Sequence, residues 1–422
     1  MSRLNVWLEN KPCGFIDQTP QGDLKFQYFD SYTDASTPLS LSMPIGHLDY
    51  PKNRILPFLK GLLPDNENAL QSIAKRFGAN ARNPFSLLKF IGRDVAGALQ
   101  ILPPNSKPTD YSDELSENST EPLSDRQISE LLFSRINEYE DATVNSSAGG
   151  LLSLAGAQAK LVLCRDADGN FTLPDQKHAS THIIKPVPTR WQNLDVVEHQ
   201  TMLAAASLGL NVAKTEISLI GGYRVFITER FDRQRDANGE VERVHQEDIC
   251  QAMAVDPAKK NQRNEGGPGV AAIAALFEEL RHEADRESCS MQFFDALAFN
   301  TLALCTDAHA KNYSLMLSQD RVRFAPLYDL ASTVLYTGLT NYAAMSIGGE
   351  YRFSDITSKG WQSEIAKLSV NPDWANERLA FIRSNLQDAF SQAGARIRSA
   401  TDNLEISRTT NALTDALAQA TK

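Results

Sequence analysis

Apolar residues recur along this chain at two spacings, one helical and one alternating, which together predict a protein that mixes helices and strands. The clearest helical pattern covers 291–305, which we predict as a buried helix with Leu302 among its core residues. The apolar runs 313–317 and 321–325 follow it and are typical of strands. A short polar loop, 306–312, joins the helix to the first strand. Functional side chains are often found on such loops, because the flanking elements hold them rigidly.

The chain before this region changes composition at residues 104–125, which are rich in Pro, Ser, Thr and acids and poor in apolar residues. Such composition is typical of a linker or an exposed loop. Residues 1 to about 100 carry alternating runs and short helical patterns, which predict a small α+β unit, and we find no catalytic constellation in it. Further helices are predicted at 195–209, 270–282, 374–397 and 403–418.

Two turn signals predict hairpins in the middle of the chain. Asn238-Gly239 lies between the strand-like runs 224–232 and 241–245, and Asp168-Gly169 lies between two shorter runs. Both dipeptides favour the positive backbone angles that tight hairpin turns require.

Composition and charge exclude several classes of protein. Five cysteines are scattered without a C-x-x-C pair, so neither a disulfide framework nor a zinc site is predicted, and a reducing cytoplasm fits best. No run of about 18 apolar residues exists to span a membrane, and the first residues lack the apolar core of a signal peptide. The net charge of -10 gives the chain no overall basic footprint for nucleic acid. A local basic patch or a DNA-binding partner remains open.

The polar loop and the segment after it supply three residues with a suggestive spacing. Asp307 is followed by Asn312, and Asp329 comes after the second strand. Protein kinases arrange their catalytic base, metal-holding Asn and metal-holding Asp in this order. The alternative is that all three are capping or turn residues, positions that Asp and Asn favour.

Upstream segments offer the other parts that phosphoryl transfer needs. The small-residue stretch 153–160 can bring backbone N–H groups close to a phosphate, or it is a plain turn. Lys185 ends a short apolar strand, as a phosphate-gripping lysine does, or is simply solvated. Glu198 on the following helix either pairs with this lysine or is an acid near the helix N-terminus.

These parts occur in the order found in kinases, and their agreement favours a kinase over each residue's ordinary role. In that interpretation Asp307 orients the acceptor hydroxyl, Asn312 and Asp329 hold Mg²⁺, and Lys185 holds ATP phosphates. A metallohydrolase built on His309 lacks partners, because the other histidines show no metal-ligand spacing. A serine hydrolase lacks the G-x-S-x-G motif.

Several longer motifs make the chain resemble the HipA family, the kinase toxins of bacterial type II toxin–antitoxin modules, over nearly its whole length. The motifs are Phe58-Leu-Lys-Gly-Leu-Leu-Pro-Asp65, Ser153-Leu-Ala-Gly-Ala-Gln158 with Lys160, Thr228-Glu-Arg-Phe-Asp-Arg233, Gln246-Glu-Asp-Ile-Cys-Gln251, Glu265-Gly-Gly-Pro-Gly269, Thr306-Asp-Ala-His-Ala-Lys-Asn312 and Tyr328-Asp329. Taken together, these motifs are highly specific.

The resemblance assigns roles to individual residues. It implies that Asp307 is the catalytic residue, that Asn312 and Asp329 bind magnesium, and that Ser153 is an autophosphorylated serine whose modification inactivates the kinase. The residues that it implies for ATP binding are Ala155, Gly156, Ala157, Gln158, Ala159, Lys160, Lys185, Glu229, Arg230, Phe231, His309, Ala310, Lys311, Asn312, Tyr328 and Asp329.

The resemblance also implies a fold and partners. The expected fold class is α+β, with a small N-terminal α/β subdomain, a protein-kinase-like core and an all-α C-terminal lobe. The expected domains are an N-terminal α+β subdomain at 1–105, a kinase N-lobe-like part at 106–235 with the phosphate loop and ATP-gripping lysine, and a mainly helical C-lobe at 236–422 with the catalytic loop and metal site. The core is expected to be related to protein and lipid kinases. The expected partners are a dimeric HipB-like helix-turn-helix antitoxin, operator DNA reached mainly through that antitoxin, and an aminoacyl-tRNA synthetase as substrate. No membrane is expected as a partner.

Two other functions stay open from the sequence. A catalytically weak nucleotide-binding scaffold would act only as co-repressor with its antitoxin, but it would be expected to have lost Asp307, Asn312 or Asp329, and all three are present. A small-molecule or lipid kinase would share the whole site and differ in the acceptor groove.

Overall fold

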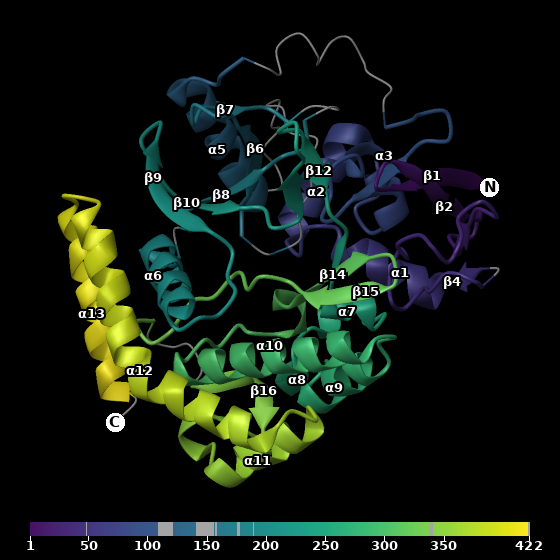
Figure 1. Cartoon of the computed structure of the whole chain (residues 1–422). Helices are drawn as coiled ribbons and strands as arrows, with labels where there is room; N and C mark the ends of the chain where they lie inside the picture. Colours follow the sequence, from purple (N-terminus) through teal and green to yellow (C-terminus); the bar gives the residue numbers. More distant parts are fainter. Residues whose placement is uncertain are drawn as a thin grey trace. The chain divides into compact units, whose positions relative to one another are not determined.

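The computed structural model describes residues 1–47, 49–108, 121–140, 156, 158–174, 178–188, 190–336 and 341–420. The chain forms two compact units, each assembled from separate segments of the sequence. Unit 1 contains Met1–Pro186, Ser218–Pro257 and Met316–Asp320, and unit 2 contains Val187–Ile217, Ala258–Leu315 and Arg321–Lys422. Figure 1 labels the helices and strands. No helix in the described part of the chain is both long and apolar enough to cross a membrane.

Unit 1 begins with a five-stranded sheet of order β4-β3-β2-β1-β5, in which the paired strands are antiparallel. Strand β1 shows why it forms: Leu4, Val6 and Leu8 alternate with more exposed residues and face the core. The strands are β1 Ser2–Leu8, β2 Lys11–Gln18, β3 Leu24–Tyr28, β4 Tyr50–Pro51 and β5 Leu99–Leu102.

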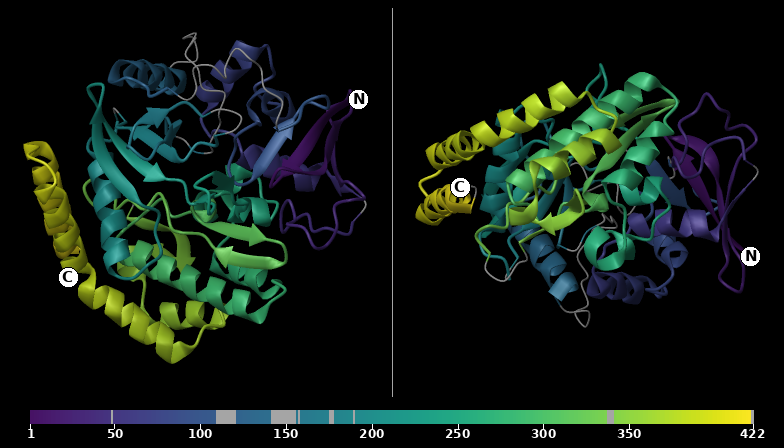
Figure 2. Two further views of the ribbon diagram at one scale, coloured as in Figure 1. Left: turned by 45° about the horizontal axis from the view of Figure 1, so that its top comes forward. Right: turned by 90° about the horizontal axis from the view of Figure 1, so that it is seen from below.

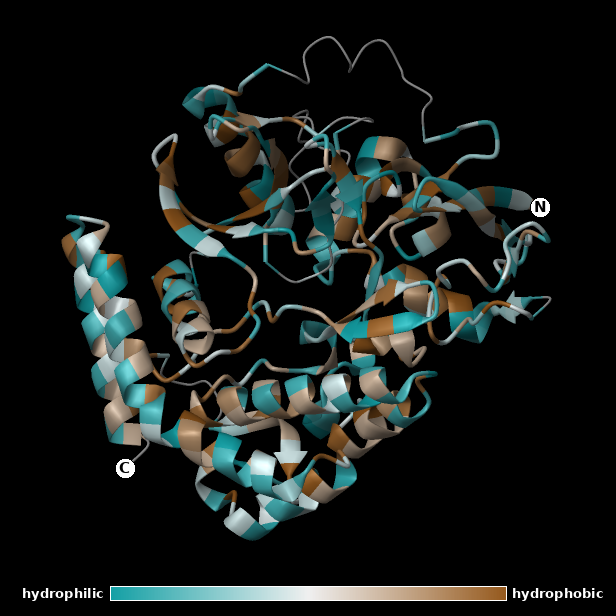
Figure 3. Ribbon diagram, viewed as in Figure 1, coloured by the Kyte–Doolittle hydropathy of each residue, from teal (hydrophilic) through white to brown (hydrophobic). Residues whose placement is uncertain are grey.

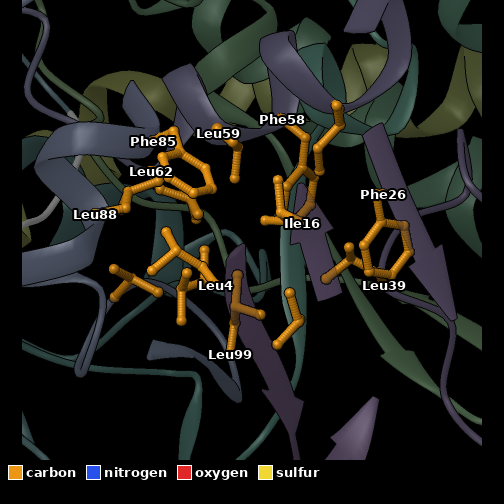
Figure 4. Packing of buried hydrophobic residues seen from close by; sticks show 14 of the residues in the cluster. Leu4, Ile16, Phe26, Leu39, Phe58, Leu59, Leu62, Phe85, Leu88 and Leu99 are labelled. Atoms are coloured by element: carbon orange, nitrogen blue, oxygen red, sulfur yellow. The ribbon is translucent and has the colours of Figure 1, made fainter. Parts of the chain in front are cut away.

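Three helices complete the core of this sheet: α1 Lys52–Gly61, α2 Glu67–Phe77 and α3 Pro84–Ile91. Helix α2 starts at an Asn66 side chain that accepts from the Ala69 N–H, and it ends at Gly78 in the left-handed conformation. In Figure 4 the side chains of Phe58, Leu59 and Phe85 point toward those of Leu4 and Ile16 between helices and strands. This apolar cluster is the core of the N-terminal α+β unit that the sequence predicts.

The second sheet of unit 1 has the order β7-β6-β8-β10-β9. Helix α5, Asp125–Glu140, packs on it through Ile128 and Leu132, which join a buried cluster with Leu163 and Ile184. The strands are β6 Leu161–Arg165, β7 Phe171–Thr172, β8 His182–Pro186, β9 Thr215–Ile220 and β10 Tyr223–Glu229, and the division between the units passes through β9.

Short elements follow the second sheet in the sequence. Strands β11 Arg233–Arg235 and β12 Val241–Arg243 pair as a hairpin, and β13 Gln246–Asp248 leads into the short helix α7 Ile249–Ala252. The Asn238-Gly239 hairpin is confirmed, but its first strand is β11, not 224–232, because the chain leaves the sheet at Glu229. The Asp168-Gly169 hairpin between β6 and β7 is also confirmed.

Unit 2 is mainly helical, and its long helices pack on one another. Helix α10 contacts α9 and α12, while α12 also contacts α6 and α13; two further views show α12 and α13 side by side (Figure 2). Hydrophilic and hydrophobic residues are interspersed along both of these helices (Figure 3), as amphipathic helices require. The helices are α6 Leu194–Ser207, α8 Gln262–Glu265, α9 Val270–Glu278, α10 Glu283–Leu302, α11 Ser358–Lys367, α12 Pro372–Ser399 and α13 Leu404–Ala420.

Large aromatic side chains fill the interior of this helical unit. Phe294 meets Trp361 edge to face at 5.9 Å, and Phe299 stacks on Phe390 at 6.4 Å between ring centroids. Leu302, which we expected in the core, is only half-buried because α10 ends at this residue. The unit also carries the short strands β15 Arg321–Phe324, β16 Tyr342–Ile347 and β17 Glu350–Arg352, and β14 Ser314–Ser318 begins in it.

Candidate active site

The predicted catalytic loop lies in unit 2, directly after α10. Leu304 has a positive φ of 56°, which reverses the chain, and the Cys305 N–H then donates to the Asn300 carbonyl at 2.8 Å. Cys305 is buried, whereas the Asp307 side chain is 81% exposed. The loop is therefore anchored at its base and presents the Asp307 carboxylate to solvent, where an acceptor hydroxyl can reach it.

Asn312 is tied to Asp307 within this loop. Its Nδ2 donates to the Asp307 main-chain carbonyl at 2.7 Å, and the His309 N–H donates to the same carbonyl at 2.8 Å. The 3-10 turn Ala310–Asn312 closes the loop. Because Nδ2 is used in this bond, Oδ1 is the side-chain atom of Asn312 suited to a hard cation such as Mg²⁺.

His309 and Lys311 are buried beneath the exposed carboxylate. His309 Nε2 lies 3.7 Å from Asp307 Oδ1, a distance that forms an ion pair only when the imidazole is protonated. The Lys311 carbonyl accepts from the Tyr328 hydroxyl at 2.8 Å, and that hydroxyl lies 2.7 Å from Ser314 Oγ. These bonds connect the catalytic loop to the segment that carries the second predicted metal ligand.

Asp329 follows Tyr328 with a φ of +54°, in the left-handed region that residues other than Gly rarely adopt. Neighbouring bonds hold this conformation: the Leu327 N–H donates to Asn211 at 2.8 Å, and the Leu327 carbonyl accepts from Ala213 at 2.9 Å. A left-handed residue costs about 1–2 kcal/mol. Glu9 and Ser369, which lie outside the predicted site, have the same backbone conformation, so the role of Asp329 as a metal ligand stays a prediction.

The side-chain oxygens of Asn312 and Asp329 suit magnesium better than a transition metal. No group of three or more His, Cys, Asp or Glu side chains gathers into a metal cluster in the described ranges. One carboxamide oxygen and one carboxylate are instead the hard oxygen ligands with which proteins hold Mg²⁺, leaving further positions for water and phosphate.

Lys185 lies in unit 1, on the central strand β8. It is 4% exposed, so the solvated alternative for this lysine is excluded. Its Nζ is 5.1 Å from the ring centroid of Phe226, the residue opposite it on β10. Glu198 is buried in unit 2, and its pairing with Lys185 stays a prediction.

The described part of the predicted phosphate loop lies beside the end of β8. Gln158 Nε2 donates to the Pro186 carbonyl at 3.0 Å, one residue after Lys185. Gly156 has a φ of +124°, and its carbonyl accepts from the Asp65 N–H at 3.1 Å. Sequence reasoning missed this contact with Asp65, although the motif that ends at Asp65 was a signal for it. Ser153, Ala155 and Ala157 lie outside the described residues.

The predicted hinge, Glu229–Phe231, leads into a buried group of charges in unit 1. Arg230 forms an ion pair with Asp232 at 2.7 Å, donates to Ser180 Oγ at 2.8 Å and to the Val95 carbonyl at 3.0 Å. Its main-chain N–H donates to the Thr181 carbonyl at 2.8 Å. Both the side chain and the N–H of Arg230 are thus used within the protein, so an ATP contact by this residue would have to use its carbonyl.

The same group of charges extends to Asp94, which lies 2.8 Å from Arg233. Burial alone would raise the pKa of the Asp232 carboxyl, but the nearby Arg230 and Arg233 guanidinium groups outweigh it and hold that pKa below its usual range. Asp94 and Asp232 therefore stay ionised although both are buried. Sequence periodicity gave no sign of this network, because its members are far apart in the chain.

An exposed aspartate, a carboxamide bonded to the main-chain carbonyl of that aspartate, and a second aspartate downstream agree with the arrangement expected of a phosphotransferase of the protein-kinase class. Comparison with known proteins names the family. Residues 4–102 match the HipA N-terminal domain, and residues 152–398 match the HipA-like C-terminal domain. The chain belongs to the HipA family and is a serine/threonine protein kinase of the toxin–antitoxin type.

Individual relatives agree with this assignment. Protein Y4mE of Sinorhizobium fredii, named as a kinase, is 36% identical over 96% of this chain and 93% of its own length. The serine/threonine-protein kinase toxin HipA of Shewanella oneidensis is 30% identical over 77% of this chain and 73% of its own length. A solved complex of Shewanella oneidensis HipA with HipB and operator DNA superposes with a TM-score of 0.82 and 25% identity, covering 99% of this chain and 96% of that one. The predicted α+β, kinase-like fold class is thereby confirmed.

Proposed function

We propose that this kinase is an ATP- and magnesium-dependent toxin that phosphorylates an aminoacyl-tRNA synthetase, stalls translation and favours dormancy. The observation that carries its catalytic part is the bond from Asn312 Nδ2 to the Asp307 carbonyl, at 2.7 Å. It fixes a predicted metal ligand against the main chain of the predicted catalytic residue, whose own carboxylate is exposed. The name of the Shewanella oneidensis relative supports the toxin part.

In the proposed mechanism the exposed Asp307 carboxylate accepts a hydrogen bond from the acceptor serine or threonine and orients that hydroxyl toward the phosphate. Asn312 Oδ1 and the Asp329 carboxylate would hold Mg²⁺, which when bound neutralises charge on the phosphates. The left-handed backbone at Asp329 supports this role, because it sets the direction of the carboxylate through the main chain. Positioning and charge supply most of the catalysis in phosphoryl transfer.

On the nucleotide side, Lys185 and the phosphate loop would hold the ATP phosphates. The bond from Gln158 to the Pro186 carbonyl supports this, because it brings the end of that loop next to Lys185. Phe231, Glu229 and the carbonyl of Arg230 would line the adenine side. The remaining ATP-binding residues are proposed as the resemblance implies them: Ala155, Gly156, Ala157, Ala159, Lys160, His309, Ala310, Lys311 and Tyr328.

Ser153 is proposed as the autophosphorylation site that switches the kinase off. Phosphorylation adds a charge of about -2, which would repel ATP from a loop built to hold phosphate. The bond between the Gly156 carbonyl and the Asp65 N–H holds the loop three residues after this serine. Loss of that contact on phosphorylation would be a second way to remove the loop from the site.

A HipB-like antitoxin dimer is the proposed partner, and operator DNA would be bound mainly through it. Two observations support this division of labour: the Shewanella oneidensis relative was solved with both partners, and this chain carries a net charge of -10. In a mobility-shift experiment, the chain alone should leave operator DNA unshifted and should add to the shift caused by the antitoxin. A shift of DNA by the chain alone at physiological salt would contradict this proposal.

The catalytic part is tested by the intact mass of unphosphorylated protein before and after incubation with Mg-ATP. Wild type should gain phosphate at Ser153, whereas Asp307→Gln should fold normally and gain none. Asp402→Asn, at another exposed aspartate of the same unit, is the matched control and should behave as wild type. If wild-type protein binds ATP but gains no phosphate, the nucleotide-binding scaffold becomes the better description. If wild-type protein does gain phosphate, purified aminoacyl-tRNA synthetases offered as substrates would test the proposed target.

A further inference from the structure

Unit 2 contains a pocket of about 570 Å³ that none of the proposed ATP or metal residues lines. The segment before α6 forms one wall with Arg190 and Trp191, the segment after Asp329 forms another with Leu335 and Tyr336, and α13 contributes Arg408. Three separate stretches of the chain thus converge on one cavity.

Ordered contacts hold the two loop walls of this pocket together. The Tyr336 hydroxyl donates to the Gln192 carbonyl at 3.1 Å, and the rings of Trp191 and Tyr336 meet edge to face with centroids 5.4 Å apart. The Arg190 guanidinium lies 5.0 Å from the Trp191 ring centroid. The pocket is therefore built by side chains that contact one another across it.

The charged side chains that line the pocket are two arginines. Arg190 and Arg408 are both exposed, and neither has an ion pair with a carboxylate in the described part of the chain. Asp195 and Glu198 act on Tyr336, but both are buried. The pKa of the Tyr336 phenol is raised mainly by burial and to a smaller extent by these two carboxylates. The Tyr336 side chain therefore stays a neutral hydrogen-bonding group.

The pocket is connected to the catalytic loop by hydrogen bonds within the same unit. The Tyr336 N–H donates to Thr333 at 2.9 Å, and Thr333 donates twice to the Leu304 carbonyl, from its N–H at 3.1 Å and its hydroxyl at 3.0 Å. Leu304 stands three residues before Asp307. The path runs from Tyr336 to Thr333, across the hydrogen bonds to Leu304, and on to Asp307. If both short segments were fully extended, its length would be on the order of 25 Å, so Tyr336 and Asp307 lie no farther apart than about eight residues of an extended peptide can span.

We propose that this pocket binds an acidic side chain of the protein substrate, on a flank within about eight residues of the acceptor serine or threonine. Two arginines without acidic partners suit a carboxylate, which each can hold through paired N–H donors. A nucleic acid fits less well, because the Trp191 ring already contacts Arg190 and Tyr336. The inference rests on the proposed kinase function, because the position of the acidic residue is counted from an acceptor hydroxyl bound at Asp307.

Binding in the full-length Asp307→Gln protein tests the pocket separately from catalysis. The probes are fluorescein-labelled peptides, one with glutamates on both sides of a serine and one with glutamines in their place, followed by fluorescence anisotropy. The glutamate peptide should bind about tenfold more tightly, because its carboxylates can accept charge-assisted hydrogen bonds from both arginines. The double variant Arg190→Gln/Arg408→Gln should lose this preference.

The control Arg323→Gln/Arg383→Gln removes the same charge from two exposed positions of unit 2 and should keep the preference. Equal binding of the two peptides, or an equal loss in both double variants, would overturn the proposal. Oligothymidylate of matched charge that binds more tightly, with the same dependence on Arg190 and Arg408, would show a nucleic-acid site instead. Phosphate incorporation by wild type decides the kinase function independently of these outcomes.

Discussion

Glu247 offers a sharp test of how burial controls charge in unit 1. This glutamate on β13 is fully buried, and its Oε1 accepts from the Leu41 N–H at 2.8 Å. Burial raises the pKa of the Glu247 carboxyl to about 8, Asp248 adds to the rise, and bonds from Leu41 and Ser40 oppose it. At neutral pH the folded protein therefore holds a proton on Glu247 that the unfolded chain releases.

The size and sign of the effect follow from the two pKa values of Glu247. Its pKa is 4.5 in the reference state and about 8 in the folded protein, so the folded state binds more protons between these values. The resulting contribution to stability is fully present below pH 4.5 and is lost as pH rises to 8. At 1.36 kcal/mol per unit, the loss between about pH 6 and 8 is roughly 2 kcal/mol.

Urea unfolding followed by circular dichroism at about pH 6, 7 and 8 measures this loss. Glu247→Gln keeps the shape of the side chain without the ionisable proton, so its free energy of unfolding should fall about 2 kcal/mol less than that of wild type over this range. Glu242→Gln, which removes an exposed glutamate of the neighbouring β12, is the control. His245, whose pKa burial lowers to about 4, gains its proton below this window. Parallel pH profiles for wild type and Glu247→Gln would refute the reasoning.

Four further substitutions separate stability from catalysis. Leu297→Ala, in the buried face of α10, should cost about 2–5 kcal/mol in urea unfolding, and half-buried Leu302→Ala should cost less; equal losses would contradict the packing. Asp329→Gly should abolish phosphate incorporation yet keep the melting temperature, because Gly adopts a positive φ freely; retained activity would exclude Asp329 as a metal ligand. Arg230→Ala should destabilise unit 1 by roughly 3–5 kcal/mol, because the buried Asp232 loses its closest ion pair and keeps Arg233, at 3.2 Å, as its remaining one; a small change in melting would show that Arg233 alone compensates the charge.

The local geometry of the predicted catalytic loop could be anticipated from the sequence because its signal is local. Asp307 and Asn312 are only a few residues apart, and the apolar elements around them have clear periodicity. The tie from Asn312 Nδ2 to the Asp307 carbonyl spans one loop, so a spacing rule contains most of its geometry. Hairpin turns were predictable for the same reason, since Asp168-Gly169 and Asn238-Gly239 act through their own backbone angles.

Strand β9 escaped prediction because it lacks a clean alternation of buried and exposed residues. Its first five residues are half-buried or exposed, and Leu219 is 71% exposed although it is apolar. A strand at the edge of a sheet packs on fewer neighbours than a central one, so burial leaves a weaker pattern in its sequence. The prediction of one strand at 224–232 was wrong for a related reason. Arg230 and Asp232 are polar but buried, whereas an alternating pattern places polar residues in solvent.

The buried charges also bear on how the segment around the predicted hinge is held in place. Asp94, Val95 and Gly97 belong to the stretch matched by the HipA N-terminal domain, yet they contact Arg230, Asp232 and Arg233 beside the predicted hinge. The Gly97 N–H donates to Asp232 Oδ2 at 2.7 Å, and its carbonyl accepts from Arg233 at 3.0 Å. Buried charges are stable only when their partners are present. The N-terminal domain therefore supplies groups that hold the residues after β10 in place, and it belongs to the same compact unit as part of the C-terminal domain.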